Sequence, residues 1–70
     1  MEDTVKNNYK SLLRDYEVAS KHYQATGEAK LLGIAINSLL DFESKVAQLW
    51  SYRELFEVQK EIMNEGLQVI

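Results

Sequence analysis

Residues 31–50 have the sequence LLGIAINSLLDFESKVAQLW, and this stretch decides the fold. Apolar residues recur in it three and four positions apart, at Leu32, Ala35, Leu39, Phe42, Val46 and Leu49. This spacing places them on one face of an α-helix. More apolar residues flank that face on both sides, namely Leu31, Ile36, Leu40, Ala47 and Trp50. The apolar face is therefore wide, about 180° at about 100° per residue, and such a helix must contact more than one neighbour.

The residues before this stretch predict a second long helix with a narrower apolar face. Its apolar side chains follow the same spacing through Val5, Tyr9, Leu12, Tyr16, Ala19 and Tyr23. They occupy a stripe about 80° wide, which is typical of a helix that packs along one seam. Asp3 is a suitable N-cap, and Gly27 is able to adopt the left-handed conformation that ends a helix. We therefore expect helices at about 3–26 and 28–50, joined by a tight turn as antiparallel neighbours.

A third, shorter helix is expected at about 52–64. Ser51 and Glu54 have the spacing of a capping box, with Trp50 and Leu55 placed as a hydrophobic staple around it. A continuous helix bent at Ser51 is the alternative. Gly66 is a suitable C-cap for this helix. Its expected buried face consists of Tyr52, Leu55, Phe56, Gln59, Ile62 and Met63.

The fold class that follows is all-α, with a long antiparallel helical hairpin and a shorter third helix in a single domain over residues 1–70. The chain has 70 residues with no proline to interrupt a helix and no cysteine to form a disulfide. A domain of this size is near the lower limit of independent stability, and the short helix covers only part of the hairpin. We therefore expect a helical-bundle homodimer, with a monomer bound to a partner as the alternative.

Composition and motifs argue against most classes of activity. The first residues lack the basic and apolar regions of a secretory signal, and no apolar run is long enough to span a bilayer, so we expect a cytoplasmic protein without a membrane partner. His22 is the single histidine, near a predicted helix C-terminus where an imidazole interacts favourably with the helix dipole. Metal-ligand spacings and phosphate-binding glycine motifs do not occur. We therefore expect no enzyme activity, no cofactor and no metal.

Two rows of like charge lie on the predicted helices. The acidic row contains Glu54, Glu57, Glu61 and Glu65. The basic row contains Lys6, Lys10, Arg14 and Lys21. Each row is either a solvated helix face or a contact surface. As a contact surface, the acidic row would bind a basic protein and the basic row would bind phosphates. The net charge of -3 makes a nucleic-acid partner the weaker interpretation.

Tyrosine occupies the predicted seam at seven-residue intervals, at Tyr9, Tyr16 and Tyr23. Because leucine would fill such positions without a hydroxyl, these residues indicate either a half-buried seam with hydroxyls at its rim or an association surface. Glu43 falls inside the apolar face of residues 31–50, roughly level with Tyr9 and Lys10 in an antiparallel hairpin. We expect it to form an intramolecular hydrogen bond or ion pair, with a contact across a protein interface as the alternative.

These observations favour a small protein-binding regulator, acting as an adaptor or a stoichiometric inhibitor of a larger protein. The candidate partner-binding residues are Tyr9, Tyr16, Tyr23, Glu43, Glu54, Glu57, Glu61 and Glu65. Small inhibitors carried by phages or plasmids have this form, and on that basis we expect such an origin. The alternatives are a nucleic-acid-binding regulator that uses the basic row across a dimer, and a structural subunit of a larger assembly.

Overall fold

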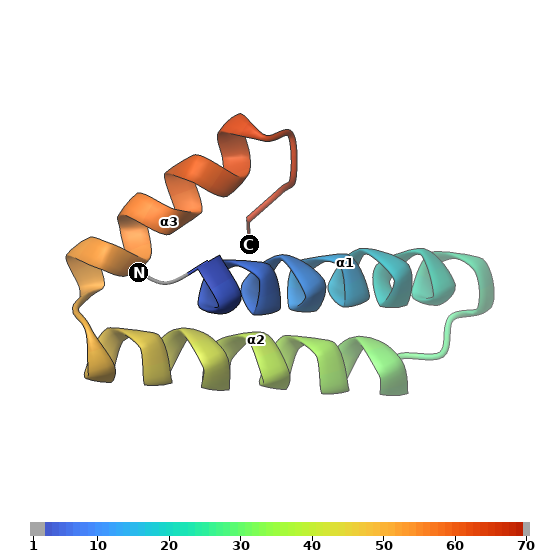
Figure 1. Cartoon of the computed structure of the whole chain (residues 1–70). Helices are drawn as coiled ribbons and strands as arrows, with labels where there is room; N and C mark the ends of the chain where they lie inside the picture. The colour runs from blue at the N-terminus through green and yellow to red at the C-terminus, as the bar shows by residue number, and fades with distance from the viewer. Residues whose placement is uncertain (1–2, 70) are drawn as a thin grey trace.

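Residues 3–69 are described by a computed structural model, and they form three α-helices. These are α1 (Asp3–Thr26), α2 (Lys30–Leu49) and α3 (Tyr52–Asn64). Helices α1 and α2 run antiparallel beside each other, and α3 leaves the end of the hairpin where α2 stops (Figure 1). The predicted all-α fold, with a long hairpin and a shorter third helix, is confirmed. Asp3 lies in the first turn of α1 and is not its cap.

The turn between α1 and α2 is set by Thr26 and Gly27. Gly27 has φ +77°, and its N–H donates to the Tyr23 carbonyl at 2.7 Å, so it ends α1 as predicted. The Thr26 hydroxyl accepts the Glu28 N–H at 3.2 Å. This bond holds the backbone at Glu28 in the turn. Helix α2 consequently begins at Lys30, two residues later than the sequence predicts.

The break between α2 and α3 occurs at Ser51, as predicted. Ser51 is extended, with φ -179° and ψ 165°, and its hydroxyl accepts the Glu54 N–H at 3.1 Å. The reciprocal bond of the capping box, from the Ser51 N–H to the Glu54 carboxylate, is not found among the described residues, and Glu54 Oε2 is buried without a hydrogen-bond partner there. Leu55 is buried, but Trp50 is 40% exposed and lies outside the core cluster. Trp50, which the sequence placed beside the apolar face of residues 31–50 and in the staple, is therefore not part of the core.

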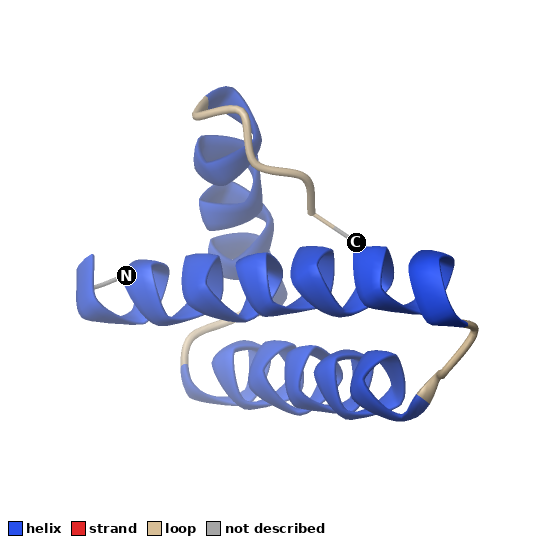
Figure 2. Cartoon of the chain, turned by 90° about the vertical axis from the view of Figure 1, so that its right-hand side faces the viewer, coloured by secondary structure: helices blue, strands red, loops and turns tan. Residues whose placement is uncertain are grey.

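The core is built from all three helices. Its buried members are Tyr9, Leu13, Leu39, Val46, Leu55, Val58 and Ile62. Leu67 and Val69, which follow α3, pack against this cluster. The chain after α3 turns back towards α1, as both cartoons show (Figures 1 and 2). Tyr23 and Leu49, expected at the ends of the two seams, are exposed.

The buried face of α3 is rotated from the predicted one. Val58 is buried with Leu55 and Ile62, whereas Tyr52, Phe56 and Met63 are exposed. The rotation is accompanied by ion pairs to Lys6 and Lys10 of α1, formed by Glu61 of α3 and by Glu65, which caps its C-terminus. Aromatic and sulfur-containing side chains are left in solvent as a result.

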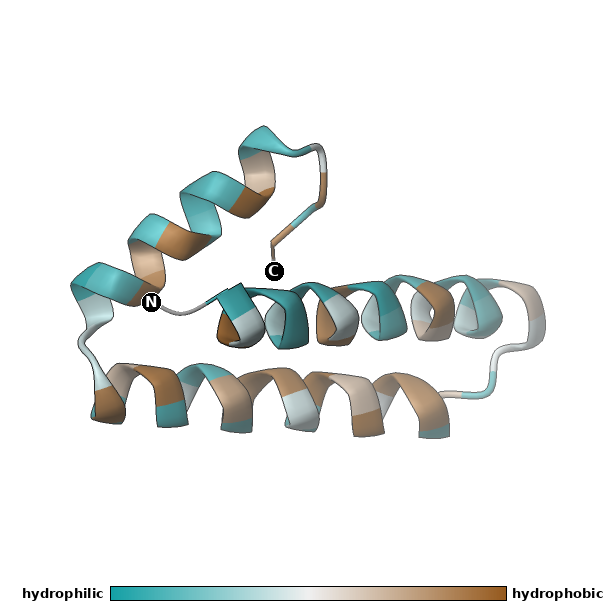
Figure 3. Ribbon diagram, viewed as in Figure 1, coloured by the Kyte–Doolittle hydropathy of each residue, from teal (hydrophilic) through white to brown (hydrophobic). Residues whose placement is uncertain are grey.

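Helix α2 carries apolar residues along its whole length, whereas in α1 apolar residues alternate with hydrophilic ones (Figure 3). Helix α3 has 13 residues against 20 in α2, so it covers only part of the wide apolar face. The exposed apolar residues of α2 are Leu31, Ile34, Ile36, Leu40 and Leu49. A partly uncovered hairpin is what the helix lengths predict, and the structure confirms it.

Candidate functional site

A polar junction joins the three helices inside the fold. The Tyr9 hydroxyl donates to the Glu43 carboxylate and accepts a hydrogen bond from Gln59 Nε2 at 2.9 Å. Gln59 also donates to Glu43 at 3.3 Å. The predicted intramolecular bond of Glu43 is thereby confirmed, and its partner is the tyrosine level with it on α1. Gln59, which the sequence indicated only as part of an apolar face, is the third member.

Tyr9 lies in the interior of the protein. Its side chain is fully buried, and its ring lies 5.4 Å from that of Phe42. Burial, and then the hydrogen bond to Glu43, raises the pKa of Tyr9 well above its ordinary value, so the phenol stays protonated and keeps donating. In this arrangement Tyr9 is not accessible to a partner. Tyr16 is half-buried against the core, and Tyr23 is exposed near the hairpin turn, so these two reach the surface.

The predicted basic and acidic rows meet each other. Lys6 Nζ lies 2.6 Å from Glu65 Oε2, and Lys10 Nζ lies 2.5 Å from Glu65 Oε1. Glu61 is 3.6 Å from Lys6. These contacts attach the C-terminal end of α3 and its C-cap residue to the first half of α1. Each row was interpreted by itself in the sequence, and the register that brings them together depends on the tertiary packing.

The ion pairs change the titration of their members. A hydrogen bond from Lys10, then one from Lys6, lowers the pKa of Glu65 to about 2. The hydrogen bond to Glu65 in turn raises the pKa of Lys6. Both groups therefore remain charged across the neutral range, and the cluster holds the two helices together.

The rest of the two rows is divided between local contacts and solvent. Exposed Glu57 lies 3.6 Å from Arg53, one turn earlier on α3. Lys21 pairs with Glu17 at 3.3 Å on α1. Glu54 is partly buried, as described above. Neither row is thus a continuous strip of unpaired charge.

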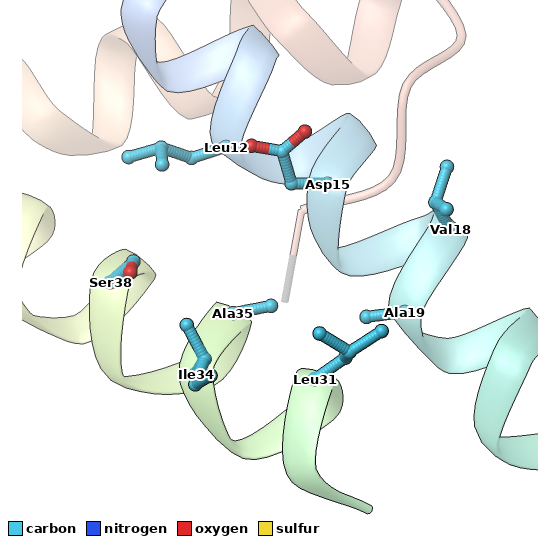
Figure 4. A pocket seen from close by; sticks show the side chains of 8 residues that line it. All are labelled: Leu12, Asp15, Val18, Ala19, Leu31, Ile34, Ala35 and Ser38. Carbon is cyan, nitrogen blue, oxygen red and sulfur yellow. The ribbon is translucent and has the colours of Figure 1, made fainter.

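An apolar groove lies between α1 and α2, and we call it the hairpin groove. It encloses about 280 Å³. Its lining consists of Leu12, Asp15, Val18, Ala19, Leu31, Ile34, Ala35 and Ser38. Figure 4 shows Val18 on α1, and Leu31 and Ile34 on α2, around the small side chains of Ala19 and Ala35. Val18 is 69% exposed and Ile34 55% exposed. Both residues were missed in the sequence because they fall outside the regular seams.

A second apolar surface follows α3, and we call it the α3 strip. It consists of Tyr52, Phe56 and Met63, which are all exposed. The rings of Tyr52 and Phe56 are 6.3 Å apart. Phe56 and Met63 line a shallow hollow together with Arg53 and Lys60. The strip was missed as a surface because its residues were expected in the core.

Comparison with protein-family models, with curated proteins and with solved structures finds no match for this chain. Within residues 3–69 there is no group of three or more histidine, cysteine, aspartate or glutamate side chains placed to hold a metal ion. None of the three described helices combines the length and hydrophobicity needed to cross a membrane. Two apolar surfaces, the hairpin groove and the α3 strip, are exposed among the described residues.

Proposed function

We propose that the protein is a small, non-enzymatic regulator that acts by binding another protein, as an adaptor or a stoichiometric inhibitor. The observation that carries the proposal is the exposure of large apolar side chains in the hairpin groove and the α3 strip. Soluble monomers rarely leave contiguous apolar patches uncovered unless these patches serve recognition. A homodimer, formed as a helical bundle, is part of the same proposal.

The α3 strip is the surface that we assign to the regulated partner. Tyrosine, phenylalanine and methionine are enriched at protein interfaces, and aromatic anchors often dominate their energetics. The strip also lies on a rigid support, because α3 is held by its buried face and by the ion pairs to α1. Glu57, which is exposed beside the strip, is the member of the acidic row best placed to contribute to the contact.

Binding of nucleic acid by the basic row is the less favoured function. Lys6 and Lys10 are engaged with Glu65, and Lys21 is paired with Glu17. Phosphate binding would require these cations to exchange carboxylates of their own chain for phosphates. This pairing weakens the case for phosphate binding by the basic row. A cytoplasmic location and a phage or plasmid origin stay predictions.

A photo-crosslinking residue placed at Phe56 tests the proposal in cells of the native host. The matched control carries the same residue at Arg14, which is exposed on α1. We expect a defined adduct from position 56 that position 14 does not give. The protein identified in the adduct is then purified and titrated by calorimetry with the parent chain and with Phe56→Ser. One-to-one binding that weakens by about 2 kcal/mol or more in Phe56→Ser is the expected result.

Two outcomes would contradict this function. One is the same set of adducts from both positions. The other is a purified partner whose affinity is unchanged by Phe56→Ser although circular dichroism shows an intact helical fold.

A further inference from the structure

We infer that the hairpin groove is filled by a second copy of this chain, so that two hairpins pack face to face as a two-fold symmetric four-helix bundle. The inference deepens the proposed function and rests on the homodimer that it includes. It assigns the groove to self-association and leaves the α3 strip free for a different protein.

The surface of the single chain is larger than its mass predicts. Its accessible area is 4972 Å² for 8.1 kDa. The usual scaling for folded monomers gives about 4,500 Å² at this mass. The chain measures 37 × 24 × 17 Å, so one long side has the scale of the roughly 800 Å² that each partner buries in a stable interface. A stable dimer therefore requires the contact to extend from the hairpin groove over most of one long side of the molecule.

The hairpin groove offers both parts of a self-complementary contact. Ala19, Ala35 and Ser38 have small side chains and form hollows between α1 and α2. Val18 and Ile34 are exposed beside these hollows. In a two-fold interface the same patch must supply the knobs and the holes. The projecting residues of one copy are of the size and chemistry that fill the hollows of the other.

The charge distribution also favours a second copy over an unrelated partner in the groove. Asp15 is the one charged residue in the groove lining. The nearby charges of α2, Asp41 and Lys45, neutralise each other at 2.9 Å. Depletion of charge is typical of interface cores, and it limits the repulsion between two groove surfaces to their two Asp15 carboxylates. The α3 strip, in contrast, has Arg53 and Lys60 beside it.

Sedimentation of single variants tests the assignment. The parent chain is expected to be a dimer at micromolar concentration, and Ile34→Glu is expected to weaken dimerisation at least a hundredfold. Phe56→Glu is the matched control, since Phe56 is 58% exposed on the α3 strip, and it should remain dimeric. Circular dichroism of each variant checks the fold. A parent chain that stays monomeric at several hundred micromolar, or a dimer lost in Phe56→Glu and kept in Ile34→Glu, would overturn the inference.

Cysteine cross-linking locates the interface, because the natural chain contains no cysteine. Ile34→Cys and Ser38→Cys lie near the centre of the proposed contact, where a two-fold axis brings each residue close to its own copy. Under mild oxidation at least one of them should form a disulfide-linked dimer. Ser44→Cys, exposed on the opposite side of α2, should not. Efficient cross-linking from Ser44→Cys alone would place the dimer elsewhere.

Failure of this inference and failure of the proposed function give different results. A monomer that still binds a partner through Phe56 removes only the dimer. A dimer that cross-links at the groove, with no partner captured at Phe56, removes only the regulatory role.

Discussion

The Tyr9 hydroxyl on α1 donates a hydrogen bond to the Glu43 carboxylate on α2, across 34 positions of the sequence. The bond fixes the level of one long helix against the other, because a shift by one turn would bury both groups without partners. Gln59 adds α3 to the same contact. The register of the whole fold thus depends on a polar group inside an otherwise apolar seam.

Tyr9→Phe should lower the free energy of unfolding by about 1 to 3 kcal/mol, since Glu43 and Gln59 lose a buried partner while the ring stays in place. Urea denaturation followed by circular dichroism measures the change. Tyr16→Phe is the control, with an expected change below about 0.5 kcal/mol, because no hydrogen bond of its hydroxyl is found among the described residues. Equal stability of the parent and Tyr9→Phe would show that the junction contributes nothing.

Leu55→Ala should cost about 2 to 5 kcal/mol, because Leu55 is buried in the core. Trp50→Ala should cost much less, about 1 kcal/mol, since Trp50 is 40% exposed and lies outside the core cluster. Thermal melts of the two variants under one set of conditions compare them. The reverse order would place Trp50 in the core.

The lowered pKa of Glu65 predicts that the protein loses stability in acid. Its folded pKa of about 2 lies below the ordinary value of 4.5, so the ion pairs to Lys10 and Lys6 contribute fully above about pH 5 and are lost as the pH falls towards 2. Glu65→Gln should therefore lose less stability than the parent between pH 5 and 2, as measured by melting temperature. Glu57→Gln should behave like the parent, because its pair with Arg53 is exposed and 3.6 Å long. Parallel acid profiles for the parent and Glu65→Gln would contradict the role of the cluster.

The two glycines of the hairpin should respond in opposite directions to alanine. Gly33 lies inside α2 with open space where a Cβ would be placed, so Gly33→Ala should stabilise the chain by about 0.5 to 1 kcal/mol. Gly27 has φ +77°, which an L side chain rarely adopts, so Gly27→Ala should destabilise it by about 1 kcal/mol or more. Chemical denaturation of the pair checks both signs. Stabilisation by Gly27→Ala would show that the turn relaxes.

The helices were predictable because their signals are local. The three- and four-residue spacing, the glycine at position 27 and the serine at position 51 act within one or two turns of the chain. The pairing of Glu43 with Tyr9 was also predictable, since a tight turn between helices of known rise fixes which residues lie level with each other. These inferences needed no knowledge of long-range packing.

The orientation of α3 was not predictable in this way. Its sequence has apolar residues on two sides, and either Val58 or Phe56 completes a face with Leu55 and Ile62. The structure buries Val58, and this rotation carries Glu65 to Lys6 and Lys10. The rotation depends on residues at the opposite end of the chain. The α3 strip and the meeting of the two charged rows were therefore beyond local patterns.

The contacts between α3 and α1 join residues far apart in the sequence, and they can form only late in synthesis. The bond between Gln59 and Tyr9 joins residues 50 positions apart, and the pair of Lys10 and Glu65 spans 55. Because the chain emerges from the ribosome in sequence order, the hairpin of α1 and α2 is available to fold before α3 has appeared. Until then the core residues of the hairpin lack Leu55, Val58 and Ile62, which belong to the same cluster, and the nascent hairpin exposes this apolar face to chaperones or to other emerging chains.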